Sequence, residues 1–160
     1  MTSLQEFRQN PEKLCQRARA GLNVLASSPL FDGRSAAVGY CFGGLTVLEM
    51  ARNGMDLAGV VSVHGSLSTA RPAATGAIKA RVLVCHGALD PHVPMPQVTT
   101  FIEEMNQAGA DWQLIAYGGA MHGFAHDSEP MVPGVAYHAA ADSRSATAIR
   151  NFLVEIFGSR

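Results

Sequence analysis

Short apolar runs alternate along the chain with longer stretches in which apolar residues recur every three or four positions. Four of the short runs have the length and composition of buried strands. They are expected over residues 36–40, 57–63, 81–85 and 112–117. Buried strands that alternate with helices predict an α/β domain with a mostly parallel sheet of about four strands flanked by helices.

Four stretches have the apolar spacing of helices. The first begins at Asn10-Pro11-Glu12, where a capping side chain precedes a proline and an acidic residue. A later one is expected to end at Gly109. The helices are expected around residues 11–25, 45–53, 98–105 and 149–157. The polar segment 66–77 contains Pro72 and Gly76 and is expected to be a loop over the functional site.

The first predicted strand leads directly into a helix through the sequence Gly39-Tyr40-Cys41-Phe42-Gly43. Glycines two residues away on each side of Cys41 allow the chain to reverse tightly, which holds the central residue in a strained conformation above the sheet. The following helix directs its N-terminus at the side chain, and its positive dipole end favours a thiolate. This pattern indicates a nucleophile elbow with Cys41 as the nucleophile.

Two later segments place further titratable residues after predicted strands. Asp90 follows the third strand within Cys85-His86-Gly87-Ala88-Leu89-Asp90-Pro91, and His122 follows the fourth within Gly119-Ala120-Met121-His122-Gly123. The carboxyl ends of parallel strands meet at one edge of a sheet, so Cys41, Asp90 and His122 are expected to lie together. A cysteine needs a nearby imidazole to take its proton, and an acid can orient that imidazole.

These three motifs, in the order nucleophile, acid, histidine, resemble the dienelactone hydrolases, a branch of the α/β-hydrolase superfamily. The resemblance runs from about Pro11 to the C-terminus and covers the second half of the family's domain. It implies a catalytic triad of Cys41, Asp90 and His122, with the backbone N–H of Phe42 as one donor of the oxyanion hole. It also implies that Gly39 and Gly43 shape the elbow.

Other residues near the expected site are candidates for lining, competing or structural roles. Tyr40, His64 and Phe124 are candidate substrate-lining residues, although packing at a strand end is the simpler expectation for His64. The stretch 121–131 is expected to border the acyl pocket. His64, His86 and His92 compete with His122 for the role of base. Cys15 and Cys85 are expected to be structural thiols, because free cysteines often behave as small buried apolar residues.

Composition excludes several classes of function. A formal net charge of −1 leaves no basic footprint for nucleic acid or an anionic membrane, and no apolar run reaches the length of a membrane span. The N-terminus lacks a signal-peptide layout, and the three cysteines are odd in number and form no CxxC pair. A cytoplasmic protein is therefore expected. No metal or cofactor is expected, since His126, Asp127 and His138 do not have metal-ligand spacing.

The chain departs from the family pattern in its first part. Residues 1–160 are interpreted as a single domain that lacks the family's N-terminal strands, together with the loop that supplies the second oxyanion N–H. The strand at 36–40 would then be an exposed apolar edge, and such an edge pairs or aggregates. The chain is either a truncated product or a natural short form that completes its sheet in a homodimer.

The first functional hypothesis is a hydrolase that opens small lactones or carboxylic esters through a cysteinyl thioester, with activity impaired by the missing half. The alternative is a catalytically impaired fragment or remnant that acts as a dimerising or small-acid-binding module. A redox-sensing thiol protein is the weakest of the three, because no resolving cysteine lies near Cys41 in the sequence.

Overall fold

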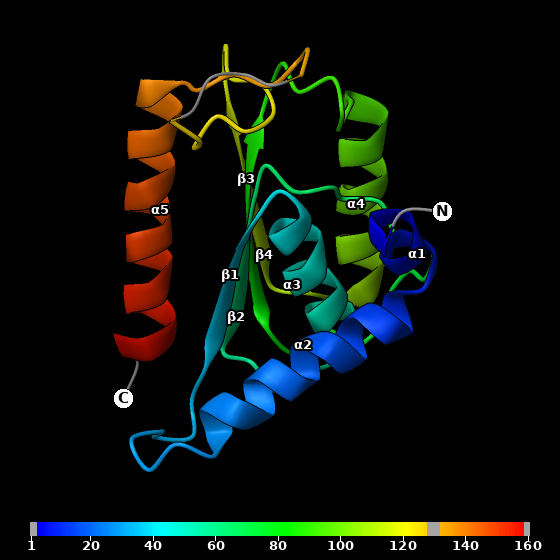
Figure 1. Ribbon diagram of the computed structural model, residues 1–160, viewed down its shortest axis with the longest axis vertical. Coiled ribbons are helices and arrows are strands. Elements are labelled where there is room, and N and C mark those ends of the chain that lie inside the picture. Colours follow the sequence, from blue (N-terminus) through cyan, green and yellow to red (C-terminus); the bar gives the residue numbers. More distant parts are fainter. Residues whose placement is uncertain (1–2, 128–131, 159–160) are drawn as a thin grey trace.

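The computed structural model describes residues 3–127 and 132–158 and contains one parallel sheet. Its four strands follow one another in space in the order β1-β2-β3-β4, so each strand lies beside the next strand of the sequence (Figure 1). The strands are β1 (Ala36–Tyr40), β2 (Gly59–Val63), β3 (Arg81–Gly87) and β4 (Trp112–Tyr117). The predicted parallel α/β architecture is confirmed.

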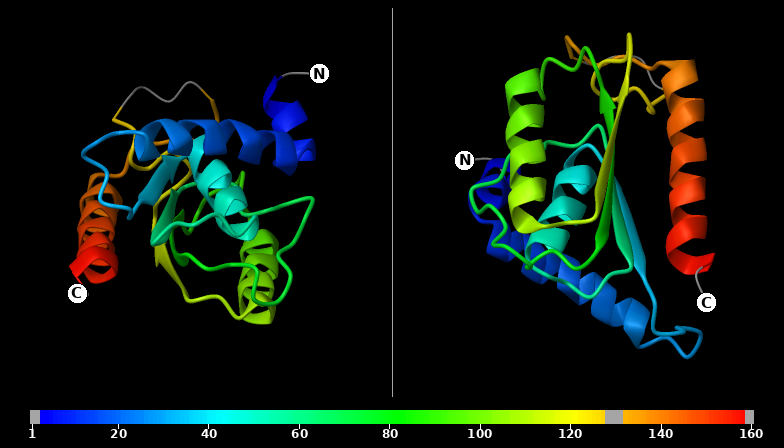
Figure 2. Two further views of the ribbon diagram at one scale, coloured as in Figure 1. Left: turned by 90° about the horizontal axis from the view of Figure 1, so that it is seen from below. Right: turned by 180° about the vertical axis from the view of Figure 1, so that it is seen from behind.

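Helices cover both faces of this sheet. One face packs against α3, α4 and the long α2, and the other face is covered by α5, as Figures 1 and 2 show from opposite sides. The helices are α1 (Ser3–Gln9), α2 (Pro11–Ala26), α3 (Phe42–Arg52), α4 (Met95–Ala108) and α5 (Ala139–Gly158). The helix α1 was not predicted, and its two turns lack a long apolar repeat.

The two faces of the sheet form two separate cores because successive strand side chains point in opposite directions. In β2, Val60 packs into the core beneath α3 and α4, whereas Val61 packs against α5. On the α5 side, Phe152 and Ile156 complete the layer. The central strands β2 and β3 are buried on both faces, which explains why they read as nearly continuous apolar runs, whereas β1 and β4 at the edges of the described sheet are partly exposed.

Most element ends agree with the sequence prediction to within three residues. Asn10 caps α2 by accepting the backbone N–H of Lys13 at 3.1 Å, and Gly109 ends α4 with a φ of 65°. The strands β1 and β4 have the expected bounds. The helix α3 begins at Phe42, three residues before the apolar repeat, because the elbow leads straight into it.

The connection between β2 and β3 contains no helix, as expected, but most of it does not lie over the elbow. It packs against α3 and α4, where the buried Arg52 donates to the carbonyl oxygen of Leu67 and to both carboxylate oxygens of Glu104. Glu104 also accepts the backbone N–H of Ala73. Within the described residues, no helix is long and apolar enough to cross a membrane.

Candidate active site

Cys41 occupies the sharp turn between β1 and α3. Its backbone has a φ of 51° and a ψ of −114°, a left-handed conformation that is strained for a residue with a side chain. The turn is held by the Cys41 N–H, which donates to Val63 at 3.1 Å, and by the Cys41 carbonyl, which accepts the N–H of Gly44 at 3.0 Å. The side chain is thus held at the carboxyl edge of the sheet, at the N-terminus of α3.

The elbow needs glycine at two positions, and one of them differs from the expected pair. A Cβ on Gly39 would lie 2.0 Å from the Gly43 carbonyl oxygen, and a Cβ on Gly44 would lie 2.6 Å from Ser62 Oγ. A Cβ on Gly43, in contrast, would meet nothing within 4 Å. Gly39 and Gly44 therefore let the turn and α3 approach the sheet closely, whereas Gly43 is not required by packing.

Asp90 lies in the turn after β3 and is buried. One carboxylate oxygen accepts the backbone N–H groups of His92 at 2.8 Å and Val93 at 3.1 Å, and the other accepts Nδ1 of His122 at 2.8 Å. Burial alone would raise the pKa of Asp90, but the hydrogen bonds from His122 and the two N–H groups outweigh it and hold the pKa below its ordinary value. Asp90 is therefore charged at neutral pH.

His122 follows β4 in a loop that is tied to the segment before α5. Its carbonyl accepts the N–H of Ala136 at 3.1 Å, and it forms an isolated bridge with Val135. The hydrogen bond to Asp90 and the interaction with Cys41 raise the pKa of His122 to about 9. The imidazole is thus held protonated at neutral pH, with one ring nitrogen on Asp90 and the other free to face Cys41.

The sequence analysis placed His64 near the site as a candidate lining residue, but it did not predict the contact of His64 with Cys41. It follows β2 with a φ of 40°, is only 1% exposed, and its Nδ1 lies 3.3 Å from Sγ of Cys41. Burial, and after it the nearby positive charge of His122, lower the pKa of His64 to about 4. His64 is therefore a neutral ring in contact with the thiol, which strand-end packing alone does not describe.

A cavity of about 200 Å³ opens beside the thiol. Leu45, Ser66 and Val93 contribute to its walls. A second cavity of about 270 Å³ shares Leu45 and Ser66 with the first and extends to Phe7 of α1. The lining of the first cavity consists of Cys41, Phe42, Leu45, Ser66, His92, Val93 and His122. The space at the thiol is small, which favours small acyl groups.

The expected lining residues lie elsewhere. Phe124 is fully buried in the core beneath α5, and its ring stands nearly perpendicular to that of His64 at 5.1 Å, so it supports His64 rather than facing the cavity. Tyr40 is half exposed, with its ring 5.8 Å from His64, and it does not line the cavity. Residues 128–131 of the expected pocket border lie outside the described part of the chain.

Among the described residues, the ring nitrogen at hydrogen-bond distance from Cys41 Sγ belongs to His64 and not to His86 or His92. His86 is buried, and its pKa is lowered by that burial. His92 lines the cavity, and its ring lies 5.3 Å from that of His122. Cys85 is fully buried, with a pKa raised to about 11 by desolvation. Cys41 is thus the partly exposed thiol of the three.

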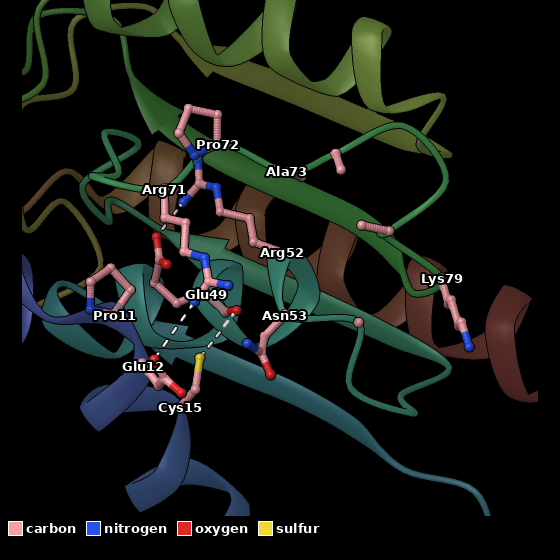
Figure 3. A pocket seen from close by; sticks show the side chains of 13 residues that line it. Pro11, Glu12, Cys15, Glu49, Arg52, Asn53, Arg71, Pro72, Ala73 and Lys79 are labelled. Atoms are coloured by element: carbon pink, nitrogen blue, oxygen red, sulfur yellow. Dashed lines mark hydrogen bonds and ion pairs between the residues drawn. The ribbon is translucent and has the colours of Figure 1, made fainter.

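A cavity of about 470 Å³ lies away from the elbow, between α2, the end of α3 and the β2–β3 connection (Figure 3). Four of its five charged groups form pairs: Arg71 reaches towards Glu12 at 3.8 Å, and Arg52 donates to Glu49 at 2.8 Å. Cys15 donates to the Glu49 carbonyl, and burial raises the pKa of Cys15 to about 11. This cavity holds a structural network rather than a reactive thiol.

The cluster at the elbow has the parts that nucleophilic chemistry requires. A thiol lies beside a protonated imidazole, and a buried carboxylate orients that imidazole. Phe42 begins α3, and the first N–H groups of a helix have no acceptor within the helix, so its N–H is available to an oxyanion. The side chains come from the ends of β1, β3 and β4, as the parallel topology predicts.

Comparison with known proteins gives matches over nearly the whole chain. A family model described as the dienelactone hydrolase family matches residues 1–157. An uncharacterized protein of Caenorhabditis elegans is 38% identical over 150 residues, a match that covers 91% of this chain and 95% of that protein.

Two solved structures are similar in both sequence and fold. A protein named m3DLH has 38% identity and a TM-score of 0.87, and the match covers 96% of this chain and 65% of that one. A dienelactone hydrolase-like promiscuous phosphotriesterase from metagenomic libraries has 37% identity and a TM-score of 0.87, and the match covers 95% of this chain and 65% of that one. This chain therefore spans just under two thirds of the length of both.

Proposed function

The chain belongs to the dienelactone hydrolase family, and on that premise we propose that it hydrolyses small carboxylic esters or lactones through a covalent intermediate on Cys41. Membership makes it an α/β-hydrolase-fold hydrolase. The cysteine nucleophile and the substrate class are our proposals. The observation that supports them most directly is the Asp90–His122 pair, whose imidazolium faces a strained, partly exposed thiol.

In the proposed first half-reaction, the Cys41 thiolate attacks the acyl carbon and a C–S bond forms. The N–H of Phe42 donates to the oxyanion of the tetrahedral intermediate. His122 gives its proton to the departing alkoxide as the C–O bond breaks, while Asp90 holds the ring in position. With a lactone the alkoxide stays tethered to the acyl group.

In the second half-reaction, His122 is neutral and removes a proton from water. The resulting hydroxide attacks the thioester carbon, and the Cys41 thiolate leaves. The carboxylic acid departs, and the imidazolium–thiolate pair is restored. Each step moves a proton only between His122, the alkoxide and water, so no cofactor is needed.

The cavity supports a small and uncharged acyl group. Its volume is about 200 Å³, below the range of roughly 300–1,000 Å³ that is usual for ligand pockets, and its described lining contains no lysine or arginine. A hydroxyl from Ser66 and the apolar Leu45 and Val93 surround the acyl position. We therefore expect acetyl and propionyl esters to be hydrolysed faster than long-chain esters or esters with a carboxylate beside the carbonyl.

The test is hydrolysis of 4-nitrophenyl acetate by the protein and by its Cys41→Ala variant. We expect turnover in the wild type, loss of turnover in Cys41→Ala, and an acetylated Cys41 on mass spectrometry of acid-quenched protein. Cys15→Ala is the matched control, because its thiol is buried away from the elbow and its pKa is raised. A phosphotriester substrate belongs in the same assay, since a relative at 37% identity is described as a phosphotriesterase.

The alternative, a catalytically impaired module that binds small acids or dimerises, makes the opposite prediction. Folded wild-type protein would then show no turnover, or turnover equal to that of Cys41→Ala. Stoichiometric acetylation of Cys41 without release would place the defect in the second half-reaction. Losing one oxyanion donor costs about 100- to 1,000-fold in rate, so the assay must resolve turnover of that reduced size.

We also propose a cytoplasmic location. The three cysteines are free thiols, and a reducing compartment keeps a nucleophilic thiol from being oxidised.

A further inference from the structure

Three potential metal-ligand atoms converge at the elbow from three different segments. The Sγ of Cys41 and one ring nitrogen each of His64 and His122 all lie within 4.8 Å of one another. The Cys41 Sγ and His64 Nδ1 are already 3.3 Å apart. The hydrolytic mechanism uses Cys41 and His122 but gives His64 no task.

The spacing suits a tetrahedral ion. With Zn–S of about 2.3 Å and Zn–N of about 2.0 Å, tetrahedral ligands lie roughly 3.5 Å apart. The Cys41–His64 pair has nearly this separation, and the remaining pairs need to close by about 1.3 Å at most, given the 4.8 Å limit. Thiolate and imidazole are ligands that Zn²⁺ prefers, whereas Mg²⁺ prefers oxygen.

One of the two histidines, His122, also has the hydrogen-bond partner that zinc-binding histidines usually have. His122 gives its Nδ1 to the carboxylate of Asp90, which leaves Nε2 as the ligand atom. A histidine held by a carboxylate in this way is the usual partner of protein-bound zinc. The cavity beside Cys41 and His122 leaves room for water at a fourth position.

We propose that Cys41, His64 and His122 form a binding site for Zn²⁺ that reversibly blocks the nucleophile. On binding to the imidazolium–thiolate pair, His122 releases its proton to solvent, the Cys41 thiolate and the two imidazoles form Zn–S and Zn–N bonds, and no electron is transferred. The sulfur lone pair that would attack an acyl carbon is then held in the Zn–S bond. Zinc is an inhibitor in this proposal and supplies no step of hydrolysis.

The affinity is expected to be moderate. Coordination through Nδ1 of His64 requires a proton on Nε2, and that atom has no hydrogen-bond partner among the described residues. A missing supporting partner typically weakens metal binding by about 10- to 100-fold. We therefore expect inhibition that EDTA reverses, rather than the permanent occupancy of a structural zinc site.

The test uses Zn²⁺ and Co²⁺ alone as probes of the whole protein. We expect one equivalent of Co²⁺ to produce a thiolate-to-metal charge-transfer band in the near ultraviolet, and Zn²⁺ to displace it while Mg²⁺ does not. The Cys41→Ser variant should lose the band, and His64→Gln should weaken binding by at least about 100-fold, since it removes a ligand itself. His92→Gln is the matched control, because His92 lines the same cavity outside the cluster.

The proposal is overturned if the wild type gives no charge-transfer band at millimolar Co²⁺, or if Cys41→Ser binds Zn²⁺ as tightly as the wild type. His64 is buried, so circular dichroism of His64→Gln must first show a folded protein, and Cys41→Ser supplies the test that does not depend on it. The binding readout is independent of turnover. An inactive protein that binds one Zn²⁺ through Cys41 would support this site and contradict only the proposed hydrolysis.

Discussion

Cys41 and His64 are the two residues other than glycine that adopt a left-handed backbone within the described chain. Each one follows a strand, and their side chains meet at 3.3 Å. Strain of this kind costs about 1–3 kcal/mol and is kept where the surroundings enforce it. The conformation of Cys41 is enforced by the close approach of Gly39 to the Gly43 backbone. The conformation of His64 is enforced by its N–H, which donates to the Cys85 carbonyl at 2.8 Å.

The site could be predicted from sequence where a residue type has a fixed place in a motif. Cys41 stands between glycines, and Asp90 and His122 each follow a strand, so their meeting point follows from parallel topology. The contact of His64 with Cys41 could not be predicted, because it depends on a positive φ at a non-glycine residue. The only signal for it was a histidine directly after a buried strand.

From the Asp90–His122 pair we expect a specific pH dependence of kcat/KM. The pKa of His122 is raised to about 9 from 6.5, with the hydrogen bond to Asp90 as the largest cause, so the imidazolium needed for alkoxide departure is lost only above about pH 9. In Asp90→Asn, the upper limb of the kcat/KM profile should move towards 6.5, and kcat should fall by about two to four orders of magnitude. A pH–rate series on both proteins measures this.

Asp127 is exposed, so Asp127→Asn controls for the loss of a negative charge. The upper limb of its kcat/KM–pH profile should lie at the same pH as in the wild type. Unfolding gives an independent check. Stabilisation through His122 is complete below pH 6.5 and lost as pH rises through about 9, while stabilisation through Asp90 is present above 3.8 and lost as pH falls. An unchanged upper limb in Asp90→Asn would refute the proposed role of the pair.

At the scale of elements, β2 and β3 were predictable because they are buried on both faces and are therefore largely apolar. The path of the β2–β3 connection could not be predicted from the sequence, because one long side chain, that of Arg52, holds it in place. Arg52, at the end of α3, reaches the connection through Leu67 and the middle of α4 through Glu104. Nothing in the local sequence identifies a distant partner for an arginine at a helix end.

This buried network predicts a large cost when Arg52 is replaced. Arg52→Leu would leave the carboxylates of Glu49 and Glu104 buried without their cation, and breaking such a pair costs about 3–5 kcal/mol. Arg81→Leu, which removes half-exposed ion pairs to Asp111 and Glu155, should cost less than about 1 kcal/mol. Urea unfolding of the three proteins gives the comparison, and equal costs for the two variants would contradict it.

At the scale of the whole molecule, β1 is an edge of the sheet in the described chain, where it pairs with β2 alone. Val38 and Tyr40 on this strand are 40% and 47% exposed. An apolar edge strand with unpaired backbone groups is a template for another strand. We propose that two copies of the chain pair through β1 to form a symmetric dimer.

Light scattering tests this pairing. We expect a dimer for the wild type and a shift towards monomer for Val38→Lys, because a lysine on an edge strand opposes strand addition. Val154→Lys is the matched control, since Val154 is a 66% exposed valine on α5, away from β1. A monomeric wild type, or a Val38→Lys variant that remains dimeric, would argue against edge pairing.

The sequential strand order also bears on how the protein is made. Each strand pairs with the next one in the chain, so the sheet can grow by short-range additions as the polypeptide leaves the ribosome. The segments that build the elbow, β1, α3 and β2, emerge early, whereas the loop of His122 and the covering helix α5 are synthesised last. During synthesis, His64 after β2 is therefore available to the thiol of Cys41 before His122 is. The nascent chain acquires its proposed base only when its C-terminal segment docks.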